Sequence, residues 1–126
     1  MWEKWLRKIL NRRQGNRRIP LQVPVFTTDP DGKEHEVVSE DVSDSGVRLR
    51  FQKIGLTNVL GHREEVPLKI RLSQNEDPVI THAQLVWAYN TVQGGSVSGW
   101  RFVTFDGNSE QRLGDFLSQY EGLQTA

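Results

Sequence analysis

From residue 21 onward, hydrophobic and polar positions alternate in short segments that are separated by turn residues. An alternation of period two predicts strands with one buried face. It is clearest at Val47, Leu49 and Phe51, and again between Val66 and Leu72. We expect about six strands, over residues 21–28, 34–40, 47–52, 66–72, 80–89 and 99–105. Short strands at such regular spacing favour a mainly β fold, a small antiparallel barrel.

The connections between these strands are rich in the residues that turns use. Residues 29–32 predict a tight turn, residues 41–46 a polar loop, and residues 93–96 the link between the last two strands. Pro20 and Pro24 accompany the first strand. Because proline has no N–H to donate, we expect that strand at an edge of the sheet.

Both ends of the chain show helical periodicity. An amphipathic helix is predicted over residues 1–10, and its apolar face consists of Trp2, Trp5, Leu6, Ile9 and Leu10. A second helix, over residues 109–120, would plug or flank the barrel with Leu113, Phe116, Leu117 and Tyr120. The predicted organisation is a helix (1–10), an arginine-rich loop (11–20) and a barrel with its C-terminal helix (21–126).

The 126 residues suit one domain, and their net charge of zero hides an asymmetry. Residues 1–18 hold seven basic side chains and one acidic one, whereas the remaining 108 residues hold nine basic and fifteen acidic ones. A cationic segment attached to an acidic body suits an anionic partner such as a phosphate, a nucleic acid, a membrane surface or the body itself.

The composition argues against an enzyme. There is no cysteine, which excludes disulfides and thiolate sites, and His35, His62 and His82 lack the spacing of metal ligands. No nucleophile stands beside a base, so we expect no catalysis, no metal and no cofactor. No apolar run could span a membrane, and no signal peptide is evident, so we expect a cytoplasmic protein.

Two clusters carry candidate chemistry. The first contains Arg12, Arg13, Arg17 and Arg18 around Gly15. A guanidinium group can clamp a phosphate, bind the O6/N7 edge of guanine or stack on a base, and Gly15 would let the arginines converge. The alternative is a flexible basic linker.

The second cluster is Asp41-x-Ser43-x-x-Gly46, between two strands. A carboxylate can accept from N1–H and N2–H of guanine, and a hydroxyl can bond a base or a phosphate. Gly46 would supply a permissive backbone at the start of the next strand. The alternative is a simple hairpin turn.

Taken together, Arg13-x-x-x-Arg17 and Asp41-x-Ser43-x-x-Gly46 resemble the motifs of the PilZ family of cyclic di-GMP receptors. The resemblance covers residues 11–120, and the segments Leu85–Trp87 and Gly99–Phe102 agree with it. It implies a six-stranded antiparallel barrel, a mobile arginine loop, and cyclic di-GMP as the ligand in place of any cofactor.

The resemblance also implies roles for single residues. Arg13 and Arg17 would take the phosphates and a guanine, Asp41 and Ser43 would bind the guanine on the barrel, and Gly46 would shape the turn. Arg12, just before the motif, favours an intercalated pair of ligands over a single one. The candidate ligand-binding set is completed by Arg18, Trp87 and Gly99, although Trp87 could instead be a core residue.

The resulting hypothesis is a bacterial receptor that closes its arginine loop on cyclic di-GMP and signals to a partner protein, as in motility or biofilm regulation. The partner would use the face of Trp2, Trp5, Leu6 and Ile9, and we rank intramolecular packing or a protein partner above lipid. One alternative is a nucleotide-independent interaction adaptor of the same fold. A barrel that binds single-stranded nucleic acid ranks lower, and an enzyme comes last. A monomer and a homodimer both remain open.

Overall fold

The computed structural model describes residues 18–52, 60 and 63–125. These residues form the strands β1 (Ile19–Pro20), β2 (Pro24–Thr28), β3 (Glu34–Val42), β4 (Gly46–Phe51), β5 (Val66–Ile70), β6 (Val79–Asn90) and β7 (Ser96–Phe105), followed by the helix α3 (Ser109–Thr125).

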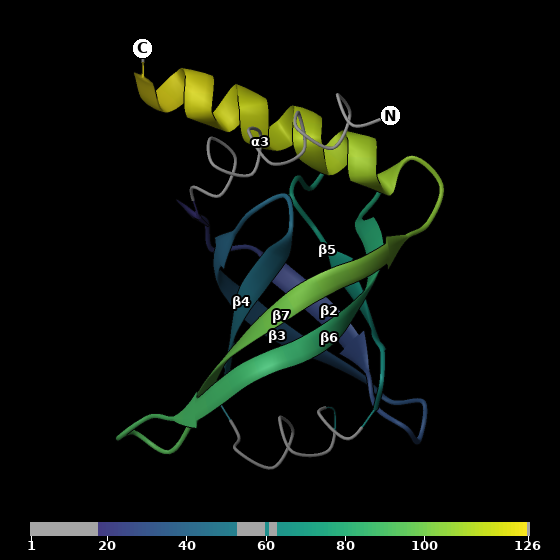
Figure 1. The fold of residues 1–126 in the computed structure, drawn as a ribbon, viewed down its shortest axis with the longest axis vertical. Helices are drawn as coiled ribbons and strands as arrows, with labels where there is room; N and C mark the ends of the chain where they lie inside the picture. Colours follow the sequence, from purple (N-terminus) through teal and green to yellow (C-terminus); the bar gives the residue numbers. More distant parts are fainter. Residues whose placement is uncertain (1–17, 53–59, 61–62, 126) are drawn as a thin grey trace, which may run out of the picture.

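The strands form one antiparallel sheet in the order β1-β3-β2-β5-β6-β7-β4 (Figure 1). Because β4 also pairs with β3, strands β2 to β7 close into a six-stranded barrel, and β1 is added along β3. The predicted mainly β, six-stranded antiparallel barrel is therefore confirmed.

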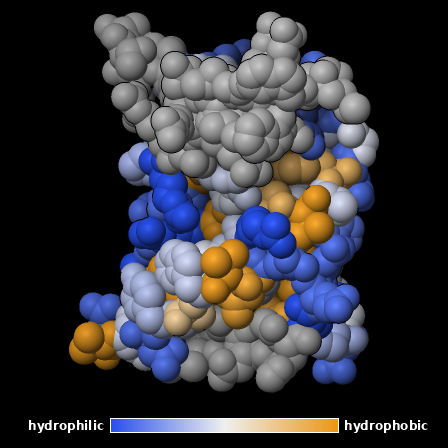
Figure 2. All heavy atoms as spheres, viewed as in Figure 1, coloured by the Kyte–Doolittle hydropathy of each residue, from blue (hydrophilic) through white to orange (hydrophobic). Residues whose placement is uncertain are grey.

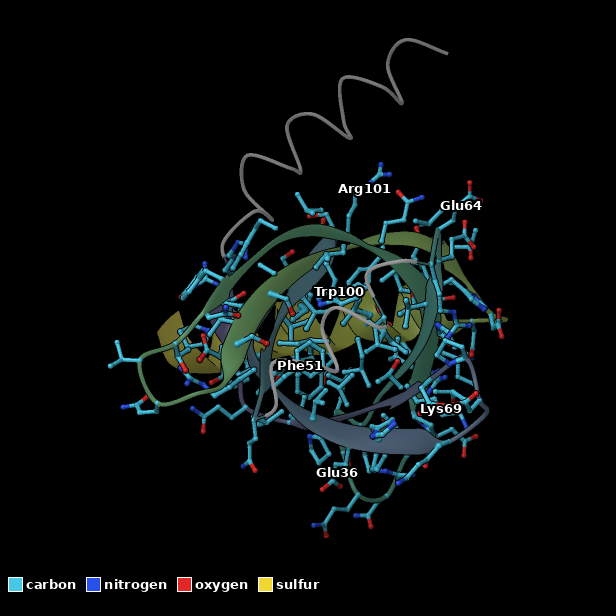
Figure 3. All side chains as sticks on the ribbon, turned by 90° about the horizontal axis from the view of Figure 1, so that it is seen from below. Glu36, Phe51, Glu64, Lys69, Trp100 and Arg101 are labelled. Atoms are coloured by element: carbon cyan, nitrogen blue, oxygen red, sulfur yellow. The ribbon has the colours of Figure 1, made fainter. Side chains whose placement is uncertain are left out.

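The barrel interior is filled by the apolar positions of the alternating segments. In β4, Val47, Leu49 and Phe51 are buried, whereas Arg50 is exposed. Figure 3 shows Phe51 and Trp100 inside the ring of strands, with Glu36 and Arg101 pointing away from it. The alternation thus separates core from surface as a half-buried sheet requires.

Helix α3 lies across one end of the barrel (Figure 1). Its residues Leu113 and Leu117 are buried in the core. The buried Ser109 hydroxyl accepts from the Ile80 N–H at 3.0 Å, and Arg112 donates to the Pro78 carbonyl at 3.0 Å. The predicted C-terminal helix is confirmed, and it extends to Thr125.

The expectation of an edge position for the first strand is wrong, because β2 pairs with β3 on one side and β5 on the other. Proline is tolerated as the first residue of a strand, which is the place of Pro24. The strand also begins later than predicted. Before it, the Ser39 hydroxyl donates to the Leu21 carbonyl at 2.5 Å and accepts from the Val23 N–H at 3.0 Å. These bonds add to two backbone bonds with β3, from the Leu21 N–H to the Glu40 carbonyl and from the Ser39 N–H to the Val23 carbonyl.

The predicted loop over residues 41–46 is shorter in the structure. Asp41 and Val42 belong to β3 and Gly46 begins β4, so only residues 43–45 lie between these two strands. Strand β7 begins three residues earlier than predicted. The helix predicted for residues 1–10 lies outside the described residues, and so do Arg12, Arg13 and Arg17.

Candidate functional site

Four positions on four neighbouring strands form one row across the barrel wall. Asp41 of β3 is the register partner of Arg48 of β4, which is opposite Gly99 of β7, and Gly99 is opposite Trp87 of β6. We call these four residues the outer row. Figure 2 shows hydrophilic and hydrophobic side chains side by side on the face that carries β6 and β7.

A β-bulge brings Asp41 to the outside. The register of β3 against β4 shifts between Ser39 and Asp41, so that Glu40 is an extra residue. Regular alternation would turn Asp41 to the same side as the buried Ser39. With the bulge, both carboxylates reach arginines on the outer face: Glu40 accepts from Arg50 Nε at 2.6 Å, and Asp41 contacts Arg48.

The Asp41 carboxylate lies between two guanidinium groups. Its Oδ1 atom is 3.4 Å from Arg18 Nη1, and its Oδ2 atom is 3.3 Å from Arg48 Nε. The Asp41 side chain is 13% exposed, whereas that of Arg18 is 49% exposed. Asp41 is thus a partly exposed anion that is held by cations on both sides.

The segment that follows the arginine cluster pairs directly with this part of β3. Ile19 is the register partner of Val42, and Pro20 is the partner of Asp41. The Pro20 carbonyl also accepts from the Tyr120 hydroxyl at 3.3 Å, which links β1 to α3. Because Arg18 directly precedes this strand and contacts Asp41, the described end of the arginine-rich segment lies beside the second motif.

The turn between β3 and β4 is built around Ser43, which is buried. Its hydroxyl donates to the Gly46 carbonyl at 3.2 Å and accepts from the Gly46 N–H at 3.1 Å. Gly46 has no positive φ, in contrast to the permissive backbone that we expected. A Cβ atom there would overlap the backbone carbonyl of Trp100, so the glycine is needed for space.

A second bulge places Trp87. The register of β6 against β7 shifts between Leu85 and Trp87, which leaves Val86 as the extra residue, 62% exposed. Leu85 packs against the core, and Trp87 is half-buried outside it. The alternative of Trp87 as a barrel-core residue is therefore wrong. The buried tryptophan is Trp100, whose indole N–H donates to the Ser98 hydroxyl at 2.7 Å.

The ring of Trp87 connects three other side-chain positions. It lies on the Gly99 backbone, where a Cβ atom would overlap the indole. The Arg48 guanidinium carbon is 5.2 Å from its ring centroid, and the Tyr89 ring stacks on it at 5.7 Å with an interplanar angle of 8°. Together with Tyr89, the outer row thus places an acid, a cation and two aromatic rings on one wall.

The structure brings together only part of the predicted site. Arg18, Asp41, Trp87 and Gly99 lie on one wall, and the turn that holds Ser43 and Gly46 adjoins it. The positions of Arg12, Arg13 and Arg17 fall outside the described residues. Sequence analysis missed Arg48, although a register count across residues 41–48 would have placed it opposite Asp41.

Other chemical groups lie away from this wall. In the β2–β3 hairpin, His35 Nε2 lies 2.8 Å from Asp29 Oδ2. A hollow of about 730 Å³ between α3 and the loop before β6 is lined by polar residues such as Asn75, Asp77 and Gln119. Across the described residues, no three acidic, histidine or cysteine side chains gather in a way that could hold a metal ion. In the same part of the chain, no helix is long and apolar enough to cross a membrane.

A comparison with family models decides the classification. The model described as PilZ domain matches residues 11–119 of this chain. The chain belongs to the PilZ family. No curated protein sequence matches it closely enough to count as a relative.

Several solved structures share the fold of this domain. The Bacillus subtilis inhibitor of motility, MotI/DgrA, is 19% identical, with a TM-score of 0.66 over 82% of this chain and 49% of its own. The PilZ domain of CeSA, from a cellulose-synthesizing bacterium, is 21% identical, with a TM-score of 0.54 over 82% of this chain and 97% of its own.

A third structure is that of Borreliella burgdorferi PlzA in complex with c-di-GMP. It is 14% identical, with a TM-score of 0.59 over 93% of this PilZ domain and 57% of the PlzA chain. The present chain spans about half the length of MotI. At these identities, the likeness concerns the fold.

Proposed function

We propose that this PilZ domain is a receptor for cyclic di-GMP, which it binds on the outer row with the arginines that precede β1. The observation that carries the proposal is the placement of Asp41. The β3 bulge turns its carboxylate outward, and β1 pairs beside it as the continuation of the arginine cluster. The complex of PlzA with c-di-GMP supports the choice of ligand.

The ligand's chemistry matches the charges at this wall. Cyclic di-GMP has two phosphates, and the planar guanidinium group of arginine can bind a phosphate through two donors. It also has two guanines, and a carboxylate can accept hydrogen bonds from the N1–H and N2–H groups of a guanine. Arg13 and Arg17 bind the phosphates and one guanine, and Asp41 binds the guanine that lies against the barrel. Trp87 borders this base. Ser43 and Gly46 maintain the turn, and the Ser43 hydroxyl contacts the ligand only if it leaves its present bonds.

The Arg18–Asp41 contact belongs to the resting site in this proposal. It is a single contact of 3.4 Å to a half-exposed arginine, and such pairs contribute roughly 0–1 kcal/mol. A guanine edge can therefore replace it at small cost. Arg18 is then free to add its charge to those of Arg13 and Arg17.

The proposed stoichiometry is an intercalated pair of ligands for each chain. A second cyclic di-GMP adds two phosphates and a further guanine face. The guanidinium group of Arg12 can neutralise a phosphate and stack on the guanine. A single ligand for each chain would leave the receptor proposal intact and remove this role of Arg12.

The proposed output is a conformational change that is passed to a partner protein. Closure of the arginine segment on the wall acts on β1, and β1 is bonded to α3 through Tyr120 and Pro20. The apolar face of Trp2, Trp5, Leu6 and Ile9 adjoins the arginine segment in sequence and would change its packing or its partner. In this proposal, ligand binding closes the arginine loop on the barrel wall, and this closure is the switch.

Calorimetric titration of Arg13→Ala and Arg17→Ala with cyclic di-GMP tests the proposal. Loss of a charged hydrogen bond costs about 1.5–3 kcal/mol, which is roughly a tenfold to hundredfold loss of affinity. Lys69→Ala is the matched control, since Lys69 is an exposed cation on β5, across the barrel from β4. Circular dichroism shows whether each variant is folded. Unchanged affinity in both arginine variants would refute the site.

A further inference from the structure

Arg48 lies at the centre of the outer row, although it belongs to neither motif. Its register partners are Asp41 on one side and Gly99 on the other. Its guanidinium group contacts the Asp41 carboxylate and also lies over the Trp87 ring. Arg48 thus connects the acid of the row with its aromatic ring.

The ion pair between Arg48 and Asp41 is not a closed, two-bond pair. Arg48 Nε is 3.3 Å from Asp41 Oδ2, yet it is buried and has no hydrogen-bond partner. Since 34% of the Arg48 side chain is exposed, the exposed surface belongs to its other atoms. The two side chains thus lie beside each other at the surface, and the contact does not use all the donors of Arg48 or all the acceptor positions of Asp41.

The orientation of the guanidinium group is fixed by its neighbours. Gly99, the residue between Arg48 and Trp87 in the row, has no side chain, and the indole ring occupies its place. This leaves room for Arg48 to extend over the ring, at 5.2 Å from the centroid. A cation on an aromatic face gains roughly 0.5–1 kcal/mol at exposed sites, so this contact favours the observed direction of the Arg48 donors.

An acid beside a fixed cation matches the Watson–Crick edge of guanine. That edge has two donors, N2–H and N1–H, followed by one acceptor, O6. A carboxylate only accepts and a guanidinium group only donates, so Asp41 and Arg48 supply the complementary order.

We infer that Arg48 is a specificity-determining residue. It donates a hydrogen bond to O6 of the same guanine from which Asp41 accepts the N1–H and N2–H hydrogen bonds. The inference rests on the proposed binding of cyclic di-GMP. It adds a guanine-recognising residue that lies in β4, outside both sequence motifs.

The test compares the affinities of two ligands for three proteins by calorimetry. The ligands are cyclic di-GMP and cyclic di-inosine monophosphate, which keeps O6 and N1–H and lacks the 2-amino group. The proteins are the wild type, Arg48→Met, whose apolar stem can still cover Trp87, and Asp41→Asn. Arg50→Met, which removes the next outward arginine of β4, is the matched control.

We expect Arg48→Met to lower the affinity about tenfold for both ligands, because both keep O6. The loss caused by Asp41→Asn should be smaller for the inosine ligand, which lacks one of the groups that Asp41 accepts. Arg50→Met should bind as the wild type does.

Three results would overturn the inference. The first is that Arg48→Met binds cyclic di-GMP as tightly as the wild type. The second is that the loss of affinity caused by Arg48→Met is smaller for the inosine ligand, as it is for Asp41→Asn. The third is that Arg50→Met loses as much affinity as Arg48→Met. The second result would make Arg48 a support for Asp41 alone, and the third would reduce the effect to surface charge. A folded wild type that does not bind cyclic di-GMP would instead refute the proposed function itself.

Discussion

The indole ring of Trp87 rests on the backbone of Gly99, its register partner on the neighbouring strand. A Cβ atom at position 99 would overlap the ring atoms. Gly99 has no positive φ, so its backbone is one that any residue could adopt. The glycine is therefore required by the tryptophan above it, whose ring also contacts Arg48 and Tyr89.

Gly99→Ala should displace Trp87 without unfolding the barrel. The ring is half-buried and can move outward, so we expect a loss of stability of about 1 kcal/mol. Cyclic di-GMP affinity should fall, and the near-ultraviolet dichroism of Trp87, identified by a Trp87→Phe reference, should change. Gly114→Ala in α3 is the control, because a Cβ atom there meets nothing within 4 Å. Unaltered spectra and affinity would show that the contact does not matter.

Gly46→Ala should destabilise the fold more strongly. The added Cβ atom would overlap the Trp100 backbone carbonyl, and the paired strands β4 and β7 cannot separate freely. We expect a loss of about 1–3 kcal/mol in denaturant unfolding. Gly114→Ala should instead stabilise the helix by about 0.5–1 kcal/mol. Equal effects of the two substitutions would contradict the account of Gly46.

The strands were predictable because alternate residues within each strand are buried, which leaves a pattern in the local sequence. The alternation of Val47, Leu49 and Phe51, and of Val66, Leu68 and Ile70, follows from one face meeting the core. The two bulges were not predictable in this way. Regular alternation turns Trp87 inward with Leu85, and only the register of β6 against β7 in the folded barrel shows that Val86 is the extra residue.

The β2–β3 hairpin should lose stability in acid through Asp29. The hydrogen bond from His35, together with those from the Lys33 and Asp31 N–H groups, holds the pKa of Asp29 below its usual value of 3.8. A carboxyl group with a lowered folded-state pKa stabilises the fold above its unfolded-state pKa, and this contribution disappears as the pH falls through the folded-state value.

The stability difference between the wild type and Asp29→Asn should therefore be largest near neutral pH. It should narrow as the pH falls below about 4, in urea unfolding at several pH values. A difference that is constant, or that widens in acid, would contradict the role of the ionised carboxylate.

Arg18→Gln should have little effect on stability. Its partner Asp41 keeps the contact with Arg48, and an exposed single ion pair contributes less than about 1 kcal/mol. Thermal unfolding at low and high salt would measure this difference. A loss well above 1 kcal/mol would show that Arg18 holds β1 in place, and the proposed exchange for a ligand would then be costly.

The candidate site was predictable where its residues are close in sequence. The motif of Asp41, Ser43 and Gly46 contains both the outward carboxylate and the turn that supports it. The contribution of Arg48 depends on Trp87, which is 39 positions further along the chain, and on the closure of the barrel that brings β7 between them. Such a contact leaves no local pattern in the sequence.

The most direct test of the central claim is a calorimetric titration of the folded wild-type protein with cyclic di-GMP. The account predicts saturable binding, with about two ligands for each chain if the intercalated pair forms. One ligand for each chain would support the receptor and refute the pair. An absence of binding by protein shown to be folded would contradict the proposed function, and the nucleotide-independent adaptor would then be the better account of this PilZ domain.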